Sequence, residues 1–224
     1  MIALMLASHA TAAPNEKRTD VDPQEAVLNT AIAAMQQGNS ADVLAMIDPA
    51  LAAYEAQYAD EKRLIYCGMG PTETLLYMGM AASQKASAIA ISPNWCTALY
   101  LKAFALIDQK RLEEGLPYLT RAIGMAPYHA HFLNELGYVH QTLRQWPEAL
   151  DAYAKAESAA GMAPDSEQKS EQARAMRGTG FVLIEQEKWD EAEAAFRKCL
   201  KLDPNDAKAK SELQYIKENR PKNA

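Results

Sequence analysis

Residues 176–205 decide the fold of this chain and read MRGTGFVLIEQEKWDEAEAAFRKCLKLDPN. Small residues, a large aromatic residue and a proline stand in this stretch at Gly180, Ala192, Phe196, Cys199 and Pro204. Small residues let two antiparallel helices approach closely, the ring fills the space beside them, and the proline ends the second helix. The stretch therefore predicts a helical hairpin.

The same columns occur twice earlier in the chain. Moving back 43 residues gives Gly137, Ala149, Tyr153, Ala156 and Gly161, and a further 34 gives Ala103, Gly115, Leu119, Ala122 and Pro127. Self-similarity at such a period predicts stacked hairpins, each of which buries its apolar face on its neighbours.

These columns resemble the tetratricopeptide repeat. The third copy follows the family's spacing with Met176, Gly180, Leu183, Trp189, Ala192, Phe196 and the LDPN of residues 202–205. The second copy has Gly161 where the family prefers proline, and the first has Ala103 in the glycine column. The resemblance implies an all-α, right-handed superhelical solenoid of antiparallel helix pairs, with repeats at 96–129, 130–163 and 173–206. Pro164 and Ser166 stop one helix and cap the next, which predicts a first helix in the third repeat that starts near Ser166 and is about two turns longer than its counterparts.

Helices are also expected on both sides of the repeats. Residues 24–95 are interpreted as degenerate helical hairpins, with helices at 24–37 and 41–58 and a break at residues 68–71. Thr72 is expected to cap a further helix from Glu73. Residues 207–219 form a polar helix that caps the exposed end of the array.

The N-terminus has the pattern of a secretory signal. An apolar run at residues 2–6 is followed by Ala10-Thr11-Ala12, which predicts a signal peptide at 1–12 and a flexible leader at 13–23. Export to the periplasm is expected, with Ala13 as the mature start. A basic segment before the apolar run is missing, and the alternative is an apolar helix tip packed on the solenoid of a cytoplasmic protein.

Charge and motifs exclude several classes of function. The net charge of −6 provides no basic stripe for nucleic acid, and no apolar run approaches the length of a membrane span. No phosphate loop, nucleophile elbow or zinc-protease motif occurs, so neither a cofactor nor catalysis is expected. The alternative is a metal-dependent enzyme or metal-binding protein that uses His131, Glu135 and His140, with His129 and His131 as an H-x-H pair. Side chains two apart on a helix diverge, which disfavours it.

The three cysteines have different expected roles. Cys199 occupies a packed alanine column and is interpreted as a small core residue. Cys67 and Cys96 lie in neighbouring hairpins, and in an exported protein they could form a disulfide. The sequence leaves that pairing open.

In the family that the chain resembles, the first helix of each hairpin lines a concave groove that holds a segment of a partner. The corresponding positions here are Tyr100, Phe104, His131, Asn134, Tyr138, Arg174, Arg177 and Phe181. Phe104, Tyr138 and Phe181 are expected to form an aromatic ladder, and the two arginines to pair with a partner carboxylate. The alternative is that neighbouring helices cover the aromatic rings.

The sequence therefore predicts a non-catalytic module that binds another protein or peptide. An envelope-assembly adaptor, a chaperone for a secreted substrate and an immunity protein that blocks a toxin all fit it. The chaperone-tail clamp of some family members places Lys and Asn where Tyr100 and Phe104 stand here, which disfavours a cytosolic co-chaperone. The oligomeric state stays open.

Overall fold

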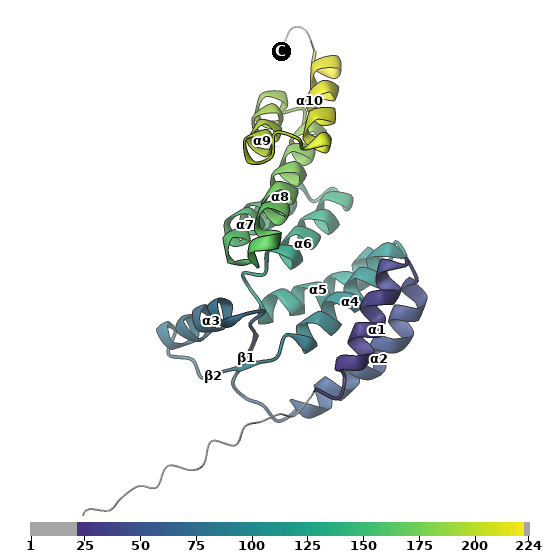
Figure 1. Cartoon of the computed structure of the whole chain (residues 1–224), viewed down its shortest axis with the longest axis vertical. Coiled ribbons are helices and arrows are strands. Elements are labelled where there is room, and N and C mark those ends of the chain that lie inside the picture. Colours follow the sequence, from purple (N-terminus) through teal and green to yellow (C-terminus); the bar gives the residue numbers. More distant parts are fainter. Residues whose placement is uncertain (1–21, 222–224) are drawn as a thin grey trace, which may run out of the picture.

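The described part of the protein is a helical solenoid that carries a small parallel sheet (Figure 1). A computed structural model describes residues 22–221. The signal peptide expected at 1–12 and most of the leader expected at 13–23 lie outside these residues. Among the described residues, no helix is both long enough and apolar enough to span a membrane.

Three consecutive helix pairs form the repeats. They are α4 (Asn94–Asp108) with α5 (Leu112–Met125), α6 (Ala130–Thr142) with α7 (Trp146–Ala159), and α8 (Asp165–Glu185) with α9 (Trp189–Leu202). A Cβ atom built on Gly137 would lie 2.6 Å from the Tyr153 ring, and one on Gly180 would lie 2.6 Å from the Phe196 ring. The glycine columns therefore let each aromatic ring lie directly on the opposite helix.

The turn inside each repeat has the same backbone conformation. Lys110, Arg144 and Glu187 follow the first helix of each pair and have φ values of 64°, 57° and 59°. A left-handed residue at this position ends a helix and satisfies its last carbonyls. None of the three is a glycine, so residue type alone gave no sign of this turn.

The longer first helix expected in the third repeat is confirmed. α8 has 21 residues, against 15 in α4 and 13 in α6. It begins at Asp165, after the short 3-10 helix η1 (Ala160–Met162) and Pro164. Its extra turns lie at the N-terminal end and extend α8 beyond its own repeat.

In the part of the chain that the structure describes, the pair α1–α2 and the helix α3 precede the repeats and α10 follows them. α1 (Glu25–Gln36) and α2 (Ser40–Gln57) form an antiparallel pair on α4, and Gly38 supplies the left-handed turn between them with a φ of 77°. α10 (Ala207–Asn219) occupies the residues expected for the capping helix and packs on α9. Asp206 caps it by accepting a hydrogen bond from the Ala209 N–H at 2.9 Å.

Residues 64–91 differ from the helical hairpin expected there. β1 (Leu64–Cys67) and β2 (Ala88–Ile91) form a two-stranded parallel sheet, and α3 (Pro71–Ser83) connects them. The strands are four residues long, which is too short for an alternating pattern to stand out, whereas α3 alone fits a helical hairpin. α3 begins at Pro71, before the expected Thr72 cap, because proline suits the first helical position, where its N–H is not needed.

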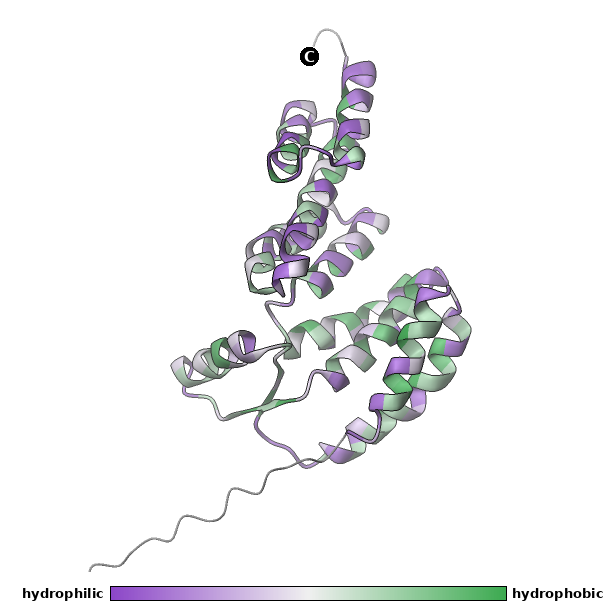
Figure 2. Ribbon diagram, in the orientation of Figure 1, coloured by the Kyte–Doolittle hydropathy of each residue, from purple (hydrophilic) through white to green (hydrophobic). Residues whose placement is uncertain are grey.

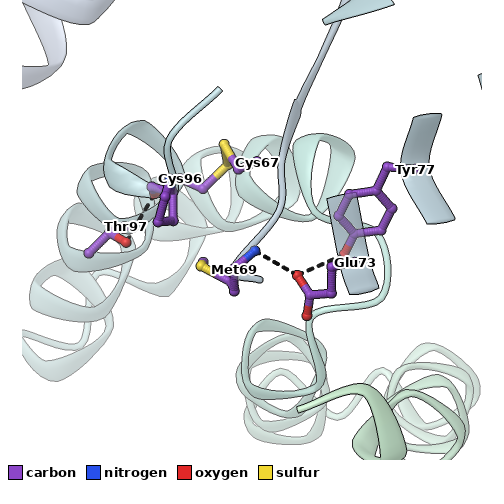
Figure 3. The surroundings of a disulfide bond; sticks show 7 residues. Cys67, Met69, Glu73, Tyr77, Cys96 and Thr97 are labelled. Atoms are coloured by element: carbon purple, nitrogen blue, oxygen red, sulfur yellow. Dashed lines mark hydrogen bonds between the residues drawn. A yellow bond between two sulfur atoms is a disulfide. The ribbon is translucent and has the colours of Figure 1, made fainter. Parts of the chain in front are cut away.

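The small sheet is tied to the repeats by a disulfide between Cys67, at the end of β1, and Cys96, in the first turn of α4 (Figure 3). Their Cα atoms lie 6.3 Å apart, and both side chains are fully buried. Glu73 lies nearby, and its carboxylate accepts hydrogen bonds from the Met69 N–H at 3.0 Å and the Tyr77 hydroxyl at 3.4 Å. Burial raises the pKa of Glu73.

The apolar core is largest in the N-terminal half. One cluster joins α1, α2, the sheet, α3, α4 and α5 and reaches Phe132 and Val139 on α6. Smaller clusters follow along the later repeats, one of which contains the buried Cys199 expected as a core residue. Figure 2 shows the same gradient, since α10 is coloured mainly hydrophilic and α4 mainly hydrophobic.

Candidate protein-interaction groove

The inner side of the C-terminal repeats contains a hollow that we call the C-terminal groove. Its volume is about 390 Å³, and α6, α7, α8, α9 and α10 all contribute to its walls. The lining residues are Tyr138, Gln141, Tyr153, Arg174, Arg177, Gly178, Phe181, Phe196, Lys208, Ser211 and Glu212. The capping helix α10 therefore closes one side of the groove as well as the end of the array.

Two aromatic side chains in the C-terminal groove are open to solvent. Tyr138 is 40% exposed and Phe181 is 42% exposed, and both line the hollow. A third ring, Tyr153, is buried beneath them and donates a hydrogen bond from its hydroxyl to Gln141 at 2.8 Å. Two of the three rings of the expected ladder thus lie in one groove.

Phe104 does not continue this ladder. It is half-buried, packs against the N-terminal core, and its ring lies 6.1 Å from that of Tyr100. It is absent from the lining of the groove. The aromatic surface is therefore shorter than expected and is confined to the second and third repeats.

Both expected arginines line the groove but already have carboxylate partners in the chain. Arg174 Nη2 lies 2.6 Å from Glu135 Oε1, and Arg177 Nη1 lies 2.5 Å from Asp206 Oδ2. Burial lowers the pKa of Arg174, but the charge and hydrogen bond of Glu135 together with the charge of Glu171 outweigh it, so that the net pKa is raised. These ion pairs hold the walls of the groove in place. The expectation that the two arginines pair with a carboxylate of the partner is therefore wrong, because carboxylates of the chain itself already occupy them.

The groove also carries a cation that sequence reasoning missed. Lys208 on α10 lines the hollow next to Glu212, and among residues 22–221 it forms no ion pair. Burial raises the pKa of Glu212, which makes this carboxylate easier to neutralise. The sequence predicts α10 only as a cap, because its polar residues carry no repeat pattern that shows which side chains face the groove.

Three further expected site residues form a polar network with Glu171 that is buried except at His131, whose side chain is 32% exposed. His131 Nδ1 lies 2.9 Å from Glu171 Oε1, and His131 Nε2 lies 2.9 Å from the Tyr100 hydroxyl. Asn134 is fully buried and donates to Glu171 Oε2 at 2.8 Å. Burial raises the pKa of Glu171, but the hydrogen bonds from His131 and Asn134 and the nearby charges of His131 and Arg174 together outweigh it and leave the pKa lowered. Tyr100 and Asn134 are thus structural, which removes them from the binding surface expected of them.

The alternative metal site is not assembled. His131 Nε2 lies 3.9 Å from Glu135 Oε1, but that carboxylate is bound to Arg174. His140 is turned away, with its Nδ1 2.6 Å from Gln145 Oε1. Over the range 22–221, no three His, Cys, Asp or Glu side chains are grouped as metal ligands.

A larger hollow of about 830 Å³ lies between α5 and the turn after α6. It is a wide surface depression whose lining includes Leu116, Pro117 and Leu143. Its other lining residues are Glu113, Thr120, Arg121 and Gln145, and no aromatic residue lines it. The smaller C-terminal groove therefore has the better chemistry for holding a partner.

Stacked antiparallel helix pairs with a hollow inner face define an α-solenoid suited to holding another protein. Family models described as tetratricopeptide repeat match residues 97–129 and 128–205. The chain is a tetratricopeptide-repeat protein.

Solved structures share this fold. The chain matches a structure described as the functional characterization of Pseudomonas aeruginosa pilF with a TM-score of 0.59 and 15% identity, over 86% of this chain and 67% of that one. It matches the MamA RS-1 ArsTM double mutant with a TM-score of 0.57 and 16% identity, over 90% of this chain and 87% of that one. No curated protein matches the sequence. At these identities the likeness concerns the fold alone.

Proposed function

We propose that the protein is a non-catalytic interaction module that holds a segment of a partner protein in the C-terminal groove. The observation that carries this proposal is the pair of solvent-open rings, Tyr138 and Phe181, in a hollow built by five helices. Exposed aromatic side chains in a pocket are the usual anchors of protein interfaces. Membership of a repeat family that builds interaction modules agrees with it.

The shape of the groove favours an extended or helical segment with an apolar anchor. The rings supply apolar contact area, and Lys208 supplies a positive charge for an acidic group beside the anchor. Arg174 and Arg177 position the walls through their ion pairs. The groove would therefore recognise its partner through contact with the two aromatic rings and through the positive charge of Lys208.

We further propose that this module works in the bacterial envelope, as an adaptor, a chaperone or an immunity protein. The apolar run and the Ala10-Thr11-Ala12 site favour export, and a disulfide between Cys67 and Cys96 suits an oxidising compartment. Intact-mass measurement of the protein from periplasmic extract should give a chain that starts at or near Ala13. A chain that retains residues 1–12 in the cell would contradict the envelope location.

The groove is tested by cross-linking followed by titration. A photo-reactive amino acid at position 138 should capture a specific partner from periplasmic extract, whereas the same group at position 215 should not. Tyr215 is a matched control because it is a tyrosine on α10, is 46% exposed and lies outside the groove.

The captured partner is then titrated with purified variants. Tyr138→Ala and Phe181→Ala should each weaken binding by about 2 kcal/mol, roughly thirtyfold, as truncated anchors do. Lys208→Glu should reduce the association rate and its dependence on salt. Tyr215→Ala should bind like the parent. Equal binding by the parent and both ring variants would place the interface elsewhere.

A further inference from the structure

Helix α10 forms a polar wall of the C-terminal groove. Three of its side chains line the hollow, Lys208, Ser211 and Glu212, whereas its buried residues Ala209 and Ile216 belong to the apolar cluster of the third repeat. Lys208 and Glu212 are four residues apart, so their side chains leave α10 on the same side, about 6 Å apart along its axis. The groove therefore presents one cation and one carboxylate from a single helix.

Neither charge is neutralised within the described chain. Over residues 22–221, Lys208 and Glu212 form no ion pair with each other or with any other side chain. The arginines of the groove are not available to Glu212, because each already holds a carboxylate of its own, Glu135 or Asp206. Burial raises the pKa of Glu212, and no cation or hydrogen bond in the described part of the chain lowers it. Both charges are therefore free to pair with a bound segment.

The two charges are also poorly placed for the stability of α10 itself. Lys208 lies in the first turn, where the helix dipole disfavours a cation. Glu212 follows Lys208 by four residues, which is the less favourable order for a charge pair on a helix. A partly buried carboxylate without a cation adds a further cost. Charges that break local rules without a gain inside the fold are expected at functional sites.

We infer that the partner segment carries one acidic and one basic side chain beside its apolar anchor, and that these two charges pair with Lys208 and Glu212. This inference rests on the function proposed above and extends it from the anchor to the charges that flank the anchor. The two partner charges lie about 6 Å apart, which is one turn of a helix or two residues of an extended strand. The rings of Tyr138 and Phe181 hold the anchor, and α10 selects the charges around it.

Both partner charges are needed because the segment covers Lys208 and Glu212 together. A segment that fills the hollow removes water from Glu212, which is costly for a carboxylate unless a donor or a cation replaces the water. A segment with acidic residues alone pairs with Lys208 but is repelled by Glu212, and a segment with basic residues alone has the opposite problem. The groove therefore accepts a segment with both charges in the matching order and rejects one in the reverse order.

Selection of peptides tests the inference without knowledge of the natural partner. A phage-displayed library of random peptides is selected on the full oxidised chain and on a charge-exchange variant, Lys208→Glu with Glu212→Lys. Both proteins have the net charge of −6. The parent should select an apolar anchor with an acidic and a basic residue at fixed positions. The exchange variant should select the same anchor with the two charges interchanged.

A second exchange on the same helix is the matched control. Lys210→Glu with Glu218→Lys also keeps the net charge, and both residues are exposed and lie outside the lining of the groove. This control should select the same peptides as the parent.

Titration of synthetic peptides then measures the size of the effect. A peptide selected on the parent should bind the parent at least about tenfold more tightly than the Lys208–Glu212 exchange variant. The same peptide with its own two charges interchanged should reverse this preference.

The possible outcomes separate this inference from the proposed function. Peptides that bind the parent and the Lys208–Glu212 exchange variant equally well, or that carry charges of one sign only, would overturn the inference. If Tyr138→Ala still weakens the binding of those peptides, the groove keeps its function and only the charge selection is wrong. A selection without enriched sequences, or peptides that bind Tyr138→Ala as well as the parent, would contradict the groove and the inference with it.

Discussion

Replacing Gly178 by alanine should destabilise the protein, although alanine favours a helix over glycine. A Cβ atom at this position in α8 would lie 2.3, 2.4 and 2.6 Å from three atoms of the Tyr153 ring. The same ring also lies close against Gly137 of α6, where a built Cβ would be 2.6 Å from it, so it has little room to move away from α8. Overpacking of this kind costs about 1–3 kcal/mol, and the gain in helix propensity offsets about 1 kcal/mol. We expect a net loss of up to about 2 kcal/mol.

The cause can be isolated with a second substitution. Thermal unfolding should show Gly178→Ala below the parent by up to roughly 8 °C, and urea unfolding should show a lower midpoint. In a Tyr153→Leu background the same change should be neutral or stabilising, because the ring that it meets is gone. Gly124→Ala in α5 is the matched control, since a Cβ there meets nothing within 4 Å. A loss of equal size in both backgrounds would refute the clash with Tyr153.

Three further predictions concern stability. Burial, with the nearby charge of His131, lowers the pKa of His129 to about 4. As the pH falls, His129 takes up a proton in the unfolded chain before it does so in the folded one, which stabilises the unfolded state. The free energy of unfolding should therefore fall by at most about 3 kcal/mol as the pH drops from about 6.5 to 4. His129→Asn, which keeps a helix-capping side chain, should remove this part of the pH dependence in urea titrations. Reduction of the Cys67–Cys96 disulfide, whose sequence separation is 29 residues, should cost about 3–4 kcal/mol, and hydrogen exchange should rise in β1 and α3 but not in α9. Asp206→Ala should destabilise α10 more than Asp206→Asn, because asparagine still caps the helix; equal unfolding midpoints would contradict the capping role.

The repeats could be predicted from the sequence because close packing between their helices requires small residues at fixed positions. Gly137 and Gly180 are small since an aromatic ring occupies the space where a side chain would lie, and that requirement recurs in each copy. The parallel sheet could not be predicted in the same way. Its residues Leu64–Cys67 and Ala88–Ile91 are too few to show a period, and what holds them is a pairing between distant segments.

The candidate site was predictable only in part, for a related reason. Tyr138 and Phe181 follow from the repeat column, which fixes the side of the helix that a residue occupies. The partners of the arginines do not follow from it. Arg174 meets Glu135 across 39 residues, and Arg177 meets Asp206 across 29, so only the folded chain reveals that both cations are neutralised.

The N-terminal extension of α8 changes how the array holds together. In an ordinary solenoid each unit interacts only with its nearest neighbours, so that units can be lost from one end without consequence at the other. Here Glu171 binds His131 of the second repeat, and the same imidazole binds Tyr100 of the first. The third repeat is thereby coupled to a unit beyond its neighbour. Unfolding that begins in the third repeat therefore removes a contact that supports the first repeat. The three repeats should unfold more cooperatively than a linear array of the same length.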